Sequence, residues 1–331
     1  MSEKIEELRQ VRIQKLEELK KRGIEAYPVE SQRTHAVGEA LKNFNELQES
    51  KDTVILAGRV KSIRIHGKLI FGNLEDQTGS VQFLLREDAV GDEKFKEFEL
   101  FDIGDFMQIE GTLALSKTSE KTLEVKTYSL LSKSIRPIPA EHFGLKDLET
   151  RLRKRYLDLL VNKESRELFE KKAIFWKTIR NFLEVRGFLE VQTPVFEDVP
   201  GGAEAEPFVT HHKALDRDFY LRISLELPLK KLIVGGFEKV FEIGRIFRNE
   251  GVSTEHLQDY TQMEFYWAYS EYQKLMNLVS EMYKETIQAV TGGLTTVYDG
   301  KEIDWSGPWP QIHYFEIFQK QTGLDLNTVF P

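Results

Sequence analysis

The sequence contains no cysteine, and this excludes both disulfide bonds and thiolate metal sites. No uninterrupted apolar run comes close to the roughly 20 residues that a membrane-spanning helix needs. The N-terminus, MSEKIEELRQVRIQKLEELKKRG, is charged throughout and lacks the apolar core of a secretory signal. From these absences we expect a cytoplasmic protein without a membrane segment.

An excess of basic residues is also missing. The chain has 46 Lys and Arg against 54 Asp and Glu, and its net charge of −8 repels phosphates as a whole. Any nucleic-acid partner must therefore be held by a local basic surface. The remaining composition, 40% hydrophobic and 30% charged, is that of a soluble globular protein, and 331 residues are enough for two cores.

Residues 1–50 are expected to form a helical arm. Apolar residues recur at roughly helical spacing among its charges: Ile5, Leu8, Ile13, Leu16 and Leu19. Gly23 and Pro28 then stop the pattern. A helix of this kind needs only to pack on the domain that follows, so we assign the arm a structural role.

Residues 51–139 are expected to form a β-barrel. Three short β-rich runs precede a helix-like segment and two more follow it, which is the order of the five-stranded OB-fold. The stretch 54–71 contains no acid and five basic or histidine side chains: Arg59, Lys61, Arg64, His66 and Lys68. On this pattern alone, nucleic-acid binding and a structural role remain equally open. The prolines of IRPIPAEHFG indicate a linker, and we place the boundary near Pro139.

Residues 140–331 mix helices and strands without a regular βαβ rhythm, which predicts an α+β domain with an antiparallel sheet. One amphipathic helix is expected over 163–186, with Gly187 as its C-cap, and another over about 270–289. Strands are expected over four further segments: 188–196, 218–227, 240–250 and 260–269.

The predicted strands carry one polar face. Residues two apart in a strand point the same way, so one side collects the following residues: Arg222, Ser224, Glu226, Glu242, Gly244, Ile246, Arg248, Glu250, Tyr260, Gln262, Glu264 and Tyr266. The opposite side is apolar and predicts a core. Arginine, glutamate and tyrosine on three neighbouring strands indicate a binding platform, although any one charge could simply form a cross-strand ion pair.

The run GRIFRNEG followed by YTQMEFYWAY resembles motif 2 of the class II aminoacyl-tRNA synthetases, and GFLEVQTPVF looks like their motif 1. Within that class the chain is most similar to the lysyl-tRNA synthetase family, through RLRKRYLDLL, PGGAEAEPF and SLEL. The resemblance covers nearly the whole chain. It implies an anticodon-binding OB-fold over 51–139 and an incomplete class II catalytic domain over 140–331.

The activity that the resemblance implies is ligation of lysine to tRNA(Lys). Lysine and ATP would form lysyl-adenylate, with Mg2+ spreading the phosphate charge, and the lysyl group would then move to the 3′ end of the tRNA. Motif 1 forms a twofold interface in this class, which implies a homodimer.

The resemblance also implies roles for individual residues. Arg248 would be the catalytic group, because its planar, permanently charged fork can bridge the lysine carboxylate and the ATP α-phosphate. ATP would further contact three residues: Glu250, His256 and Tyr260. Lysine would be held by four residues besides Arg248: Gly202, Glu226, Glu264 and Tyr266. The central anticodon uridine would be read by three residues of the barrel: Arg64, Phe71 and Gln82.

Two features depart from the family pattern. Glu255 and Leu257 stand in the motif 2 loop where many relatives carry an arginine and an asparagine, which bears on contacts with phosphate and tRNA. No arginine follows Arg248, so the arginine of motif 3 is missing, and the expected magnesium ligands would lie beyond Pro331. We therefore expect a truncated chain that does not activate lysine by itself.

Two alternatives stay open at this stage. The chain could be a tRNA-binding fragment without catalytic activity, which the missing motif 3 favours. It could also be the related ligase that attaches lysine to elongation factor P, but that group resembles the catalytic domain only, whereas residues 54–131 look like a full barrel.

Overall fold

The computed structural model describes residues 2–138, 145, 147–251, 253 and 255–329. The chain divides into two compact units, Met1–Asn162 and Lys163–Pro331. The first unit thus includes α6 (Leu148–Arg153) and α7 (Arg155–Val161), which the sequence grouped with the second half. The predicted boundary at Pro139 lies outside the described residues. In the described parts of the chain, no helix combines the length and the apolar character needed to cross a bilayer.

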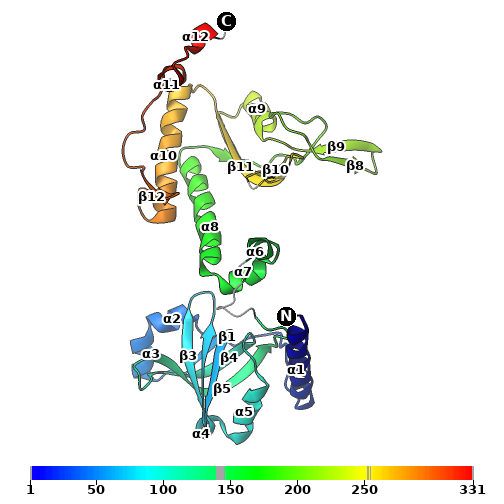
Figure 1. The fold of residues 1–331 in the computed structure, drawn as a ribbon, viewed down its shortest axis with the longest axis vertical. Coiled ribbons are helices and arrows are strands. Elements are labelled where there is room, and N and C mark those ends of the chain that lie inside the picture. Colours follow the sequence, from blue (N-terminus) through cyan, green and yellow to red (C-terminus); the bar gives the residue numbers. More distant parts are fainter. Residues whose placement is uncertain (1, 139–144, 146, 252, 254, 330–331) are drawn as a thin grey trace. The chain divides into compact units, whose positions relative to one another are not determined.

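A closed barrel with the strand order β1-β2-β3-β5-β4 forms the body of the first unit (Figure 1). Its strands are β1 (Val54–His66), β2 (Leu69–Glu75), β3 (Ser80–Arg86), β4 (Phe106–Leu115) and β5 (Lys121–Ser132). Three short helical segments join β3 to β4: α4 (Glu87–Val90), α5 (Asp92–Glu97) and η1 (Phe98–Leu100). Apolar side chains alternate inward along each strand and fill the interior. The predicted order of strands and helix is confirmed.

The N-terminal arm packs on this barrel. It consists of α1 (Ser2–Lys21), α2 (Val37–Lys42) and α3 (Phe44–Ser50), and Leu19 of α1 is fully buried in the barrel core. Lys15 lies 2.9 Å from Asp102. Beneath that pair, Lys133 lies 2.8 Å from Asp105, with both of these side chains fully buried. The arm is therefore held by apolar packing and by a partly buried network of charges.

The second unit is built on a three-stranded sheet with the order β11-β10-β6. Strands β10 (Lys239–Phe247) and β11 (Asp259–Trp267) are antiparallel, and the short β6 (Leu189–Glu190) runs parallel to β10. Helices α8 (Lys163–Glu184) and α10 (Tyr272–Thr291) pack side by side against one face (Figure 1). Helix α9 (Glu226–Val234) covers part of the other face.

Smaller elements complete the second unit. A separate sheet joins β7 (Phe196–Glu197), β9 (Arg217–Leu221) and β8 (Val209–His212) in that order. The remaining elements follow α10 along the chain: β12 (Thr295–Tyr298), β13 (Lys301–Asp304), α11 (Tyr314–Thr322) and α12 (Leu326–Val329). The α+β class expected from the sequence is therefore confirmed.

The two faces of the β10–β11 pair alternate as predicted. The apolar side chains contact α8 and α10: Phe241, Ile243, Met263, Phe265 and Trp267. The partners of the polar face also lie opposite one another, Glu242 across from Glu264 and Gly244 across from Gln262. That face is not wholly polar, because Val240 and Ile246 are fully buried beneath α9.

Two predicted strands are wrong in extent. The strand expected over 218–227 ends at Leu221, and Glu226 is the first residue of α9, whose first turn accommodates Pro228. The strand expected over 188–196 is reduced to β6 and the start of β7, with Pro194, which has no N–H to donate, between them. The polar platform thus has two strands, and the irregular segment 222–225 lies beside it without strand pairing.

Candidate active site and nucleic-acid interface

Arg248 lies just beyond the end of β10, on the polar face. Its backbone N–H donates to the carbonyl of Gln258 at 2.8 Å, which holds the chain in line with β11. The side-chain Nε donates to the carbonyl of Ile223 at 3.3 Å, and the guanidinium carbon lies 5.8 Å from the centre of the Tyr260 ring. Among the described residues no carboxylate forms an ion pair with this guanidinium. Its charge is therefore available to an anionic ligand.

Glu264 of β11 lies further along the same face, and its carboxylate is held through one oxygen. Oε1 accepts hydrogen bonds from the hydroxyl of Ser224 at 3.0 Å, from the backbone N–H of Leu225 at 3.2 Å, and from the amide of Gln262. These donors come from two parts of the chain, the segment before α9 and β11 itself. The segment SLEL and strand β11 therefore meet at this carboxylate.

Tyr266 stands next to this carboxylate. Burial raises the pKa of its phenol to about 12, and the charges of Glu264 and Glu226 contribute further. The phenol is therefore protonated at neutral pH and can donate or accept a hydrogen bond. Lys230 lies 2.6 Å from Glu226 and 5.9 Å from the centre of the Tyr266 ring, so an ammonium group already lies beside an acid and an aromatic ring here.

Gly202 brings the PGGAEAEPF loop against this group. Its φ of +85° is in the left-handed region that favours glycine. A Cβ added at this position would lie 2.9 Å from Cβ of Glu226 and 3.0 Å from Oγ of Ser224. A side chain at position 202 would therefore displace the residues that line the site. Gly202, Glu226, Glu264 and Tyr266 are accordingly found together.

A buried ion pair beneath the platform was not singled out from the sequence. Arg222 lies 2.7 Å from Glu242, and the two side chains are 4% and 3% exposed. Arg222 also donates to the carbonyls of Thr193 and Arg245, and Glu242 accepts from the backbone and hydroxyl of Thr193. A Cβ at Gly244 would lie 2.3 Å from the guanidinium, so glycine makes room for it. Alternation alone placed these residues among the ligand-facing groups.

Glu250 and His256 are exposed. His256 Nδ1 lies 2.7 Å from the hydroxyl of Ser253, and neither Glu250 nor His256 contacts Arg248 in the described structure. Glu255 and Leu257 are also exposed. Residues 252 and 254 of this loop lie outside the described residues. The ATP contacts expected at Glu250 and His256 therefore stay predictions.

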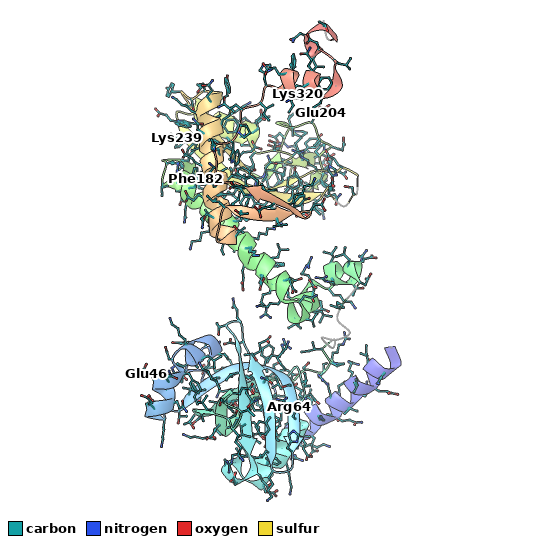
Figure 2. All side chains as sticks on the ribbon, turned by 60° about the vertical axis from the view of Figure 1, so that its left-hand side comes forward. Glu46, Arg64, Phe182, Glu204, Lys239 and Lys320 are labelled. Carbon is teal, nitrogen blue, oxygen red and sulfur yellow. The ribbon has the colours of Figure 1, made fainter. Side chains whose placement is uncertain are left out.

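Arg64, Phe71 and Gln82 share the outer face of the barrel. Arg64 is the cross-strand neighbour of Phe71, and Gln82 pairs with Asn73, two residues further along β2 (Figure 2 labels Arg64). Arg64 is exposed and Phe71 is half-buried. Gln82 is only 6% exposed. Its side-chain amide donates a hydrogen bond to Glu120 at 2.6 Å and accepts one from Thr122 at 2.9 Å. The amide orientation is therefore fixed before any base arrives.

The described residues offer no group of three or more His, Asp or Glu side chains that could hold a metal ion. The described residues therefore do not form a metal site by themselves.

Two regions of the chain match models of known protein families. Residues 147–328 match the family model of tRNA synthetases class II (D, K and N), and residues 54–131 match that of the OB-fold nucleic acid binding domain. The chain is 44% identical over 327 residues to the lysine–tRNA ligase of Pelotomaculum thermopropionicum, covering 99% of this chain and 64% of that protein. It is 44% identical over 319 residues to the lysine–tRNA ligase of Clostridium novyi, covering 96% of this chain and 62% of the relative. The chain thus spans less than two thirds of the length of these relatives.

Proposed function

The chain belongs to the class II tRNA synthetases of the D, K and N type, and from this we propose that it is part of a lysine–tRNA ligase. The protein would join lysine and ATP into lysyl-adenylate and pyrophosphate, and would then transfer lysine to the 3′ end of tRNA(Lys). The observation that carries the proposal is the arrangement of side chains on the β10–β11 face. Arg248 lies beside Tyr260 and has no ion-pair partner among the described residues. Glu264 and Tyr266 follow along β11. A cytoplasmic location accompanies the proposal, because tRNA charging supplies cytoplasmic translation.

In the first reaction Arg248 has two anions to align. Its guanidinium has several N–H donors, and only Nε is used within the described residues. The remaining donors would hold the lysine carboxylate and the ATP α-phosphate so that an oxygen of the carboxylate attacks phosphorus in line with the departing pyrophosphate. No nucleophile of the protein is required. Tyr260 would stack on the adenine, and Glu250 and His256 of the adjoining loop would close on the nucleotide once it is bound.

Lysine would lie along β11 from Arg248 toward Tyr266. Glu264 and Glu226 would contact the α-ammonium group, Tyr266 would contact the ε-ammonium group, and the backbone at Gly202 would approach the amino acid closely. An amino acid with an uncharged side chain would lose the contact between its terminal ammonium group and Tyr266, which disfavours it. Magnesium would enter with ATP, and we assign it no ligand in the described residues.

The barrel would bind the anticodon of tRNA(Lys). Phe71 is half-buried and offers a ring on which a base can stack, while the exposed Arg64 offers charge for a phosphate or a base edge. Gln82 retains one N–H and one acceptor site beyond its two hydrogen bonds, enough for a pair of contacts with a uracil edge.

A homodimer is part of the proposal. The middle of α8 exposes four apolar side chains: Leu168, Phe169, Ile174 and Phe175. Such a stripe is unfavourable in water, and a second copy would cover it. Light scattering that gives the mass of a monomer for the full-length protein at micromolar concentration would contradict this part.

Pyrophosphate exchange by the full-length protein, with each amino acid in turn, tests the activity. We expect lysine alone to support exchange, and Arg248→Ala to lower it by at least about 100-fold, because a donor to a developing charge is lost. Arg248→Lys should not restore it, since an ammonium cannot hold two anions in the same plane. Exchange that Arg248→Ala leaves unchanged would refute the proposal. Charging of tRNA(Lys) by the wild type then separates a synthetase from a ligase acting on a protein.

A further inference from the structure

The carboxylate of Glu264 is held asymmetrically. Its three hydrogen bonds, from Ser224, Leu225 and Gln262, all reach Oε1, and Oε2 accepts none of them. A carboxylate held by three donors at one oxygen cannot turn about its last bond without breaking all of them. The direction in which Oε2 points is thereby fixed before a ligand arrives.

The hydroxyl group of Ser224 is itself oriented by a hydrogen bond. It accepts a hydrogen bond from the backbone N–H of Glu226 at 3.0 Å, which is one of the free N–H groups at the start of α9. A serine hydroxyl has a single proton, and with an acceptor site already occupied that proton is directed to Glu264. Ser224 therefore connects the two acids of the site, Glu226 and Glu264.

Gln262 supports the same oxygen from β11. It precedes Glu264 by two residues and so lies on the same face of the strand, opposite Gly244. Its amide must turn the nitrogen toward the carboxylate, because a carboxylate oxygen only accepts. The strand thus supplies both the acid and one of the donors that orient it.

We propose that Ser224 and Gln262 are positioning residues that orient Glu264 toward the α-ammonium group of lysine. The inference rests on the function proposed above and adds two residues to its machinery. Both act through Glu264 and touch no substrate. They set where Oε2, the oxygen that none of these three donors reaches, lies. If Oε2 is misplaced, the ammonium group that it contacts binds more weakly.

Steady-state pyrophosphate exchange with the full-length protein tests this. The variants are Ser224→Ala and Gln262→Leu, which remove a donor and add no bulk. The matched control is Gln273→Leu, at an exposed position of α10. We expect KM for lysine to rise about 10-fold in each of the first two, by loss of one hydrogen bond to a charged group, with KM for ATP unchanged. Gln273→Leu should match the wild type in both.

A second ligand separates positioning from general damage. 6-Aminohexanoate has the carboxylate and the terminal ammonium group of lysine but lacks the α-ammonium group. As a competitive inhibitor, it should keep the same inhibition constant in Ser224→Ala and Gln262→Leu. Equal weakening of lysine and 6-aminohexanoate, or an unchanged KM for lysine, would overturn the inference while the proposed function stands. A wild type without lysine-dependent exchange would overturn both.

Discussion

The buried pair of Arg222 and Glu242 gives the sharpest prediction about stability. Its side chains are 4% and 3% exposed and lie 2.7 Å apart. Removing one partner of such a pair leaves an uncompensated charge in the interior, which costs about 3–5 kcal/mol. Glu242→Ala also removes the acceptor for Thr193. We expect the free energy of unfolding of the second unit to fall by that amount, a large part of the total of about 5–15 kcal/mol that stabilises an ordinary domain.

Tryptophan fluorescence follows this unit alone, because all four tryptophans lie in Lys163–Pro331: Trp176, Trp267, Trp305 and Trp309. With a urea dependence of about 1–3 kcal/mol per molar, the midpoint should move by at least about 1 M. Glu167→Ala, which removes the exposed partner of Lys163, is the control and should change the unfolding free energy by less than about 1 kcal/mol. The double variant Arg222→Met/Glu242→Leu should recover much of the loss, because no charge then remains buried.

A midpoint for Glu242→Ala no further shifted than that of Glu167→Ala would refute the reasoning. It would mean that water reaches the guanidinium or that the surrounding chain relaxes around it. The same variant should also weaken lysine-dependent exchange, because the residue after Arg222, Ile223, accepts the hydrogen bond from the side chain of Arg248.

Three further predictions concern other parts of the molecule. Lys133→Met should lower the unfolding free energy of the barrel unit by about 3–5 kcal/mol, because Asp105 is left buried without its partner. Circular dichroism should detect this change, and the fluorescence of the tryptophans in the second unit should not. Burial raises the pKa of the Glu197 carboxyl, so the charged form destabilises the second unit once the pH rises through that pKa. In urea titrations at pH 7, Glu197→Gln should therefore stabilise this unit by up to about 1 kcal/mol, after allowance for solvent screening. At low pH, where the carboxyl is protonated, the variant should match the wild type. Phe71→Ala should weaken tRNA binding by about 1–3 kcal/mol in a filter-binding titration and leave pyrophosphate exchange unchanged.

The sequence predicted the barrel well because its signal is local. Alternation of apolar residues along Val54–His66 and Leu69–Glu75 matches the inward and outward positions that the structure shows. The alternation on β10 and β11 was equally informative, since it separated Phe241 and Phe265 from Glu242 and Glu264. Where one face of a strand is buried, the period of two residues leaves little ambiguity.

The same rule failed where the chain leaves the sheet. The alternation predicts that Arg222, Ser224 and Glu226 are neighbours on one strand, but Glu226 belongs to α9. Period alone cannot separate a short strand from an extended segment that leads into a helix, and Pro228 was the signal available to correct it. Ile246 shows the related error, because alternation assigned it to the ligand side and α9 buries it.

Tertiary contacts decide which polar residues are available to a ligand and which pair with one another. Glu242 and Glu264 lie directly opposite on adjacent strands and look equivalent in the sequence. In the structure Glu242 is neutralised by Arg222 and closed off from water, whereas the donors that Glu264 receives from the described residues are all neutral. A carboxylate bonded to neutral donors retains its negative charge for a cation that comes later. Because Arg222 pairs with Glu242 and not with Glu264, the negative charge of Glu264 remains available to attract an ammonium group of a ligand.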